Sequence, residues 1–135
     1  MALRRSSWHR KGAATVELAI TLPVIAILTL GAIETTSLIS LRQRLLTAAY
    51  EAARTTSGPA QTSTAGITAG SSILTARGIT GGSVTMSPAS VTAATPSGTE
   101  IAATVSAPYA SNTWLKPFVL SGSGNVSVTV KMLRQ

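Results

Sequence analysis

The sequence predicts an α+β protein in which one long N-terminal helix packs against a small antiparallel sheet. Three observations indicate this fold. Residues 13–33 are almost entirely apolar, with a single charge, and as a helix would span about 30 Å at roughly 1.5 Å per residue. Residues 34–54 continue with helical periodicity but become amphipathic. After residue 82, three short segments alternate between polar and apolar side chains, as strands do.

The charge distribution places a basic arm before the apolar segment. The 135 residues carry a formal charge of +7, and four of the eleven basic side chains precede residue 13: Arg4, Arg5, Arg10 and Lys11. The remaining seven basic and four acidic residues leave an excess of only +3. A short basic arm before a span holds that end on the cytoplasmic side, and aromatic residues that would stack on bases are scarce. We therefore expect membrane orientation rather than nucleic-acid binding.

The apolar segment is long enough to cross a membrane, and it contains Glu17 and Pro23. It runs on into an amphipathic helix, unlike an ordinary secretory signal. An ionisable group in a span is costly, so Glu17 is a functional candidate; the alternative is an interfacial side chain that reaches back to Arg10 or Lys11. Pro23 removes a backbone donor and is expected to kink or loosen the helix, unless it is simply a tolerated membrane proline.

The second half of the helix carries one apolar stripe. Leu38, Leu41, Leu45 and Ala48 follow one another at spacings of 3, 4 and 3 residues, which places them on one helix face. Residues 57–135 contain only about sixteen Ile, Leu, Val and Phe residues, too few for a comfortable core of their own. We therefore expect this stripe to pack under the sheet.

The C-terminal part is predicted to contain one short helix and three strands. Gly58 and Pro59 end the long helix, and residues 65–78 form a short helix with Ile67, Ile73 and Leu74 inward and Gly78 at its end, weakened by two internal glycines. Residues 83–86, 100–107 and 125–133 are the predicted strands. The last is the clearest, because three valines at 126, 128 and 130 alternate with polar residues.

An aromatic loop at residues 108–120 has two interpretations. Trp114 and Phe118 either complete the small core or form a contact surface for other subunits of an assembly.

The N-terminal motif carries a family resemblance. A basic arm, Gly12, four residues, Glu17 and an apolar run resemble the G-x-x-x-x-E signal of type IV pilin-like proteins. The longer string GAATVELAITLPV, followed by GAIE and LRQRLLTAAYEAAR, resembles the TadE-like family, minor pseudopilins of the bacterial tight-adherence (Tad/Flp) pilus system. The resemblance covers residues 10–54, about a third of the chain.

The resemblance implies processing and assembly. A prepilin peptidase would cut between Gly12 and Ala13, and Glu17, as fifth residue of the mature chain, would pair with the new N-terminus of a neighbouring subunit. The implied layout is pilin-like, with a leader at 1–12, a transmembrane half at 13–34, an amphipathic half at 35–56 and a periplasmic or extracellular domain at 57–135. The implied partners are the peptidase, other pilin or pseudopilin subunits, the assembly platform of the bacterial inner membrane, and membrane lipid.

One departure from the pilus pattern narrows the role. Major Flp pilins are much shorter and typically carry Glu-Tyr in the motif, whereas Leu18 follows Glu17 here and a domain of some eighty residues trails the helix. This favours a minor or accessory subunit over the bulk subunit of the filament.

Catalytic, metal and cofactor sites are not expected. His9 lies alone in the basic arm, cysteine is absent, and the four acids are widely separated. Two functions remain: a processed pseudopilin that takes part in surface adherence or secretion, or an unprocessed single-span periplasmic protein that binds a partner or the cell wall. The N-terminus of the mature chain distinguishes them.

Overall fold

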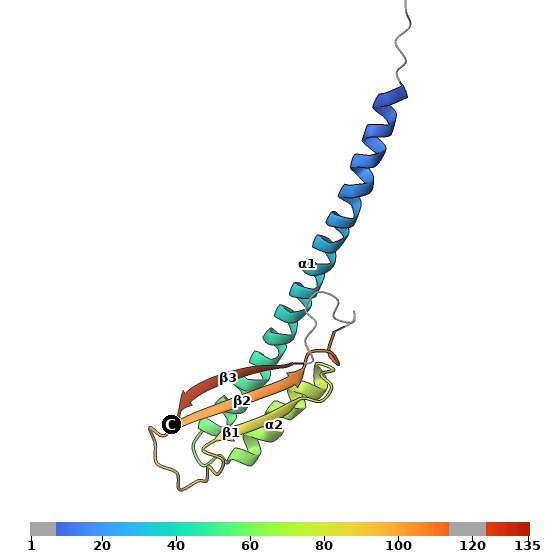
Figure 1. The fold of residues 1–135 in the computed structure, drawn as a ribbon. Helices are drawn as coiled ribbons and strands as arrows, with labels where there is room; N and C mark the ends of the chain where they lie inside the picture. Colours follow the sequence, from blue (N-terminus) through green and yellow to red (C-terminus); the bar gives the residue numbers. More distant parts are fainter. Residues whose placement is uncertain (1–7, 114–123) are drawn as a thin grey trace, which may run out of the picture.

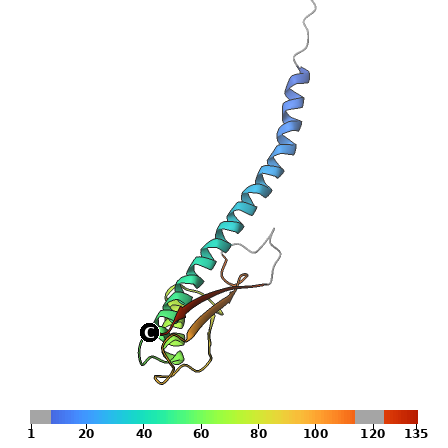
Figure 2. The same ribbon diagram turned by 90° about the vertical axis from the view of Figure 1, so that its left-hand side faces the viewer.

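A computed structural model describes residues 8–113 and 124–135 and has the expected α+β fold. The long helix α1 (Trp8–Ser57) is followed by α2 (Ser63–Ala76), β1 (Ser83–Ser87), β2 (Glu100–Pro108) and β3 (Asn125–Leu133). Figures 1 and 2 show α2 and the sheet gathered around the C-terminal half of α1, while its N-terminal half extends away alone. We call residues 12–33 of α1 the bare half, residues 34–57 the packed half, and residues 58–135 the head.

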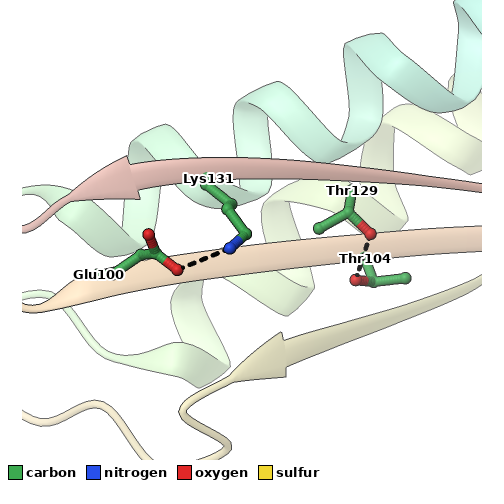
Figure 3. A network of polar contacts seen from close by, with 4 residues as sticks. All are labelled: Glu100, Thr104, Thr129 and Lys131. Atoms are coloured by element: carbon green, nitrogen blue, oxygen red, sulfur yellow. Dashed lines mark hydrogen bonds and ion pairs between the residues drawn. The ribbon is translucent and has the colours of Figure 1, made fainter.

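The three strands form one antiparallel sheet in the order β1-β2-β3. The predicted strands are confirmed to within one residue at each end. Alternate side chains of β2 are buried against the helices, namely Ile101, Ala103, Val105 and Ala107. The opposite face carries hydroxyl groups, including Thr104 and Thr129, whose oxygens lie 2.8 Å apart, and the Lys131–Glu100 ion pair at 2.9 Å (Figure 3). The sheet thus has one apolar face, which is turned to α1.

The packed half supplies the other side of the core. Leu41, Leu45 and Ala48 lie in one buried cluster with Val105 and other sheet residues, and Leu38 is partly buried against it. Further along α1, Ala52 and Ala53 belong to a second cluster that contains Ile101 and Val91. The apolar stripe of α1 therefore continues through small alanines, which let the head approach the helix backbone closely.

The inward face of α2 differs from the sequence prediction. The buried residues are Ser63, Gly66, Gly70 and Leu74, whereas Ile67 is exposed and Ile73 only partly buried. The prediction of Ile67 as an inward residue is wrong, because α2 crosses α1 too closely for a large side chain. A methyl group at Gly70 would lie 3.1 Å from the Cβ of Ala52 and 3.3 Å from the carbonyl oxygen of Ala48.

Arg134 and Gln135 cap the C-terminal end of α1. Arg134 is buried, and its Nη1 donates hydrogen bonds to the carbonyl oxygens of Thr56 and Gln61, at 3.4 and 3.2 Å. The backbone N–H of Gln135 donates to the carbonyl oxygen of Ser57 at 2.9 Å. A cation and an N–H at a helix C-terminus satisfy its free carbonyls and oppose its partial negative charge. The head is thereby attached to α1 at its far end.

Candidate functional site in the long helix

The bare half of α1 exposes large apolar side chains on every side. Ile20 and Leu28 are 67 and 68 % exposed, and further examples are Val16, Leu18, Leu22, Val24, Ile25 and Ile27. Among the described residues, Gly12–Ser57 is the segment long and apolar enough to cross a membrane by length and composition, with a mean hydropathy of 2.2 in its most apolar window and none of that window buried. In water this surface would be costly, at roughly 25 cal/mol per Å² of apolar area. The bare half therefore needs an apolar partner or solvent.

Two threonine hydroxyls of the bare half make hydrogen bonds within the helix. The hydroxyl of Thr21 donates to the carbonyl oxygen of Glu17 at 2.8 Å, and that of Thr29 donates to the carbonyl oxygen of Ile25 at the same distance. In hydrocarbon every polar group requires an internal partner, because no water is present. These threonines are thus compatible with a lipid environment.

The predicted motif residues lie at the outer end of the bare half. Gly12, Ala13 and Glu17 are exposed on α1, and a methyl group placed at Gly12 would meet nothing within 4 Å. Its backbone is therefore open to approach from outside. Of the basic arm, Arg4 and Arg5 lie outside the described residues, as do the side chains of Arg10 and Lys11.

The helix continues without interruption past Pro23. Although Pro23 has no backbone N–H to donate, α1 remains helical over all 50 residues. Whether Pro23 kinks the helix in its working environment stays a prediction.

The boundary between the two halves is marked by Glu34 and Tyr109. Glu34 is buried, and the hydroxyl of Tyr109 donates a hydrogen bond to its backbone carbonyl oxygen at 3.1 Å. Burial, together with the nearby charge of Glu34, raises the pKa of Tyr109 above its usual value of 10.0. This contact fastens the start of the loop after β2 to α1 at the point where the apolar segment ends.

The contact between Glu34 and Tyr109 was not predicted from the sequence, where Glu34 appears only in the string that carries the family resemblance. The available signal was an acid directly after an apolar run. Its partner lies 75 residues away, a separation that periodicity does not reveal. The predicted role of Trp114 and Phe118, the other two aromatic residues of the loop, falls on residues outside the described ones.

The described residues offer no metal centre. Within residues 8–113 and 124–135, no group of three or more His, Cys, Asp or Glu side chains could hold a metal ion.

Comparison with known proteins agrees with the sequence resemblance. Residues 12–54 match the family model described as TadE-like protein, and this range covers the bare half and nearly all of the packed half. No curated protein and no solved structure matches the chain. The matched family indicates a structural, non-enzymatic kind of protein associated with the Tad pilus, with an N-terminal helix able to serve as a membrane anchor. Over residues 12–54, about a third of its length, the chain is therefore similar to TadE-like proteins.

Proposed function

We propose that this chain is a minor pseudopilin, cut between Gly12 and Ala13 by a prepilin peptidase, that takes part in the assembly of a Tad-type pilus for surface adherence or secretion. One observation carries the proposal: the TadE-like match falls on the helix whose first half is bare and whose second half holds the head. A filament subunit needs both an apolar rod and a folded domain that does not cover it.

Cleavage would change the balance of forces that holds the rod in the membrane. The removed segment carries all four basic residues that precede the span, and these charges anchor the N-terminus on the cytoplasmic side. Without these charges, the bare half can leave the bilayer when apolar helices of other subunits replace the lipid around it. The inner membrane, with the head in the periplasm, is the starting location in this account, and the filament is the destination.

Glu17 has a role only after the cut. The new ammonium group at Ala13 and a carboxylate are each costly in an apolar environment, and pairing them offsets much of that cost. Glu17 lies four residues, about one helical turn, beyond Ala13. A Glu17 of a neighbouring subunit can therefore approach the new N-terminus when two rods lie side by side and are displaced by about one turn.

The mass of the mature chain tests the cleavage step. We expect intact-mass analysis of protein from cells that contain the peptidase to show a chain that begins at Ala13. Gly12→Leu places a large side chain where the peptidase must approach the backbone, so we expect it to accumulate as the precursor. Gly31→Leu, on the same helix but far from the cut, is the matched control and should be processed normally.

Two results would contradict the cleavage assignment. One is a mature wild-type chain that retains residues 1–12, which would favour an unprocessed single-span periplasmic protein. The other is normal-sized mature protein from Gly12→Leu.

Assembly is tested separately with Glu17→Ala. This variant should be cut but enter filaments poorly, because the ammonium of Ala13 loses its counter-charge. Glu100→Ala, whose carboxylate lies exposed on the head, is the control for simple loss of an acid. Filament yield measured by electron microscopy decides: unchanged filaments with Glu17→Ala remove this role.

A further inference from the structure

A small pocket with both polar and apolar walls lies beside the packed half of α1, just beyond the apolar segment. It has a volume of about 260 Å³. Its lining residues on α1 are Thr36, Ser37, Ser40, Leu41 and Arg44, and those on the loop after β2 are Asn112 and Thr113. Sites for drug-sized ligands are usually larger, at roughly 300–1,000 Å³. The pocket thus suits a small polar group.

The hydrogen bonds of the lining residues show which of them are available to a ligand. Thr36 and Ser37 donate their hydroxyl protons to the carbonyl oxygens of Ala32 and Ile33. Asn112 is also engaged: its amide nitrogen donates to the carbonyl oxygens of Thr80 and Pro108, and its amide oxygen accepts from the N–H of Thr80. These three residues form fixed walls.

Two donors in the pocket remain free. Within the described residues, neither the hydroxyl of Ser40 nor the guanidinium of Arg44 takes part in a hydrogen bond or an ion pair. The guanidinium carries five N–H donors and a fixed positive charge, and it binds phosphate oxygens in a bidentate manner. A free arginine next to a free hydroxyl is a donor set for an oxyanion.

The position of the pocket along α1 indicates where the oxyanion comes from, because it places the pocket near the lipid headgroups. Thr36 lies about 5 Å beyond Ile33 along the axis, and Arg44 about 17 Å beyond it, at 1.5 Å per residue. Side chains on a helix lean toward its N-terminus, so the guanidinium of Arg44 reaches back toward the membrane. The headgroup layer extends about 5–8 Å beyond the hydrocarbon, and a tilted helix comes closer still. The pocket is therefore level with the headgroups or just above them.

We propose that this pocket binds the phosphate of a phospholipid headgroup in the leaflet on the side of the head, with Arg44 and Ser40 as donors. This inference rests on the membrane placement in the proposed function. The bound phosphate fixes the head in one orientation above the bilayer before the rod is extracted. Extraction then breaks this contact.

Lipid binding to the full chain tests the site. Native mass spectrometry of the full chain in detergent micelles measures the bound fraction of phosphatidylglycerol and of diacylglycerol, which has the same chains but no phosphate. We expect retention of phosphatidylglycerol and little retention of diacylglycerol. Arg44→Gln should weaken phosphatidylglycerol binding about tenfold, the loss expected from a charge-assisted contact. Ser40→Ala should weaken it less.

Arg42→Gln is the matched control. Arg42 is also an exposed arginine of α1, two residues away and outside the pocket lining. Since both variants remove one exposed positive charge from the packed half, a general attraction of the basic chain to anionic lipid would decrease equally in the two. Equal losses, or no loss with Arg44→Gln, would overturn the site. Inorganic phosphate that displaces the lipid at matched concentration would overturn the assignment to a lipid headgroup.

The outcome is separable from that of the cleavage experiment. The pocket is present in both precursor and mature chain, so its lipid binding does not depend on the cut at Gly12. Selective loss with Arg44→Gln but no cleavage would remove the pseudopilin proposal and keep the lipid site. If the chain is cleaved but Arg44→Gln shows no selective loss of lipid binding, the pseudopilin proposal stands and the lipid site is removed.

Discussion

The two halves of α1 are one continuous helix in two different environments. In the bare half, apolar side chains are exposed on all sides, whereas in the packed half Leu45 and Ala48 are completely buried and Arg42 and Arg44 are exposed. Both halves are α-helical throughout, although Pro23 in the bare half lacks one backbone donor. The comparison teaches that helix formation does not distinguish the halves; what differs is the medium that each surface requires.

A group of buried alanines lets the head lie close to the packed half. The packed half presents alanines at 48, 49, 52 and 53, all of them completely buried under the head. The bare half instead presents large aliphatic side chains all round. Close approach of a folded domain requires small residues, while contact with lipid or with other helices of a filament requires uninterrupted apolar surface.

The largest expected difference comes from a matched pair of leucines. Leu45→Ala should lower the free energy of unfolding of the head by about 2–5 kcal/mol, because it leaves a cavity in the core. Leu22→Ala, in the bare half, should leave it unchanged, since Leu22 is 56 % exposed and does not touch the head. Denaturant unfolding in detergent micelles, followed by near-ultraviolet circular dichroism, measures both. Equal losses would mean that the halves are not independent.

A smaller effect is expected from the helix crossing. A methyl group at Gly66 would collide with the hydroxyl of Thr56 and lie 2.7 Å from the carbonyl oxygen of Ala52. Gly66→Ala should therefore destabilise the head by about 1–3 kcal/mol through overpacking. Gly31→Ala is the control, because nothing lies within 4 Å of a methyl group there and alanine favours the helix. A Gly66→Ala head as stable as wild type would contradict the close crossing of α1 and α2.

The smallest expected effect concerns the boundary between the halves. Because the pKa of Tyr109 is raised in the folded chain, its neutral hydroxyl stabilises the fold fully below the unfolded value of about 10. That contribution is lost as the pH rises through the raised pKa. Tyr109→Phe should cost about 1 kcal/mol at neutral pH and lack this alkaline loss.

Tyr50→Phe provides the comparison for the alkaline experiment, because Tyr50 is half exposed. Unfolding measured between pH 8 and 11 should show wild type and Tyr50→Phe losing stability together. If Tyr109→Phe loses the same amount over this interval, Tyr109 does not titrate as described.

Periodic features of the fold were predictable from the sequence. The strands could be placed because alternate residues such as Val128 and Thr129 face opposite sides of a sheet whose one face is buried. The apolar stripe at Leu41 and Leu45 was visible for the same reason, at the helical period. Such patterns are local, so a single sequence contains them.

The remaining features depend on long-range contacts. Gly66 and Gly70 looked like weak points of a helix, although they are the residues that allow α2 to cross α1. The buried Arg134 at the end of α1 and the contact of Tyr109 with Glu34 join residues more than 70 positions apart. At the candidate site, the motif at Gly12 and Glu17 was proposed from the family resemblance, and its role stays a prediction. The pocket beside Arg44 could not be predicted, because it forms only when the loop after β2 lies against α1.

Cysteine labelling in intact membranes tests the division of α1 most directly. The chain has no cysteine, so single substitutions report one position each. Ile25→Cys lies in the bare half and Tyr50→Cys on the exposed side of the packed half, with 53 and 50 % exposure in the wild-type chain. With a water-soluble maleimide, we expect rapid labelling of Tyr50→Cys and almost none of Ile25→Cys until detergent is added. Equal labelling of the two in intact membranes would contradict the account.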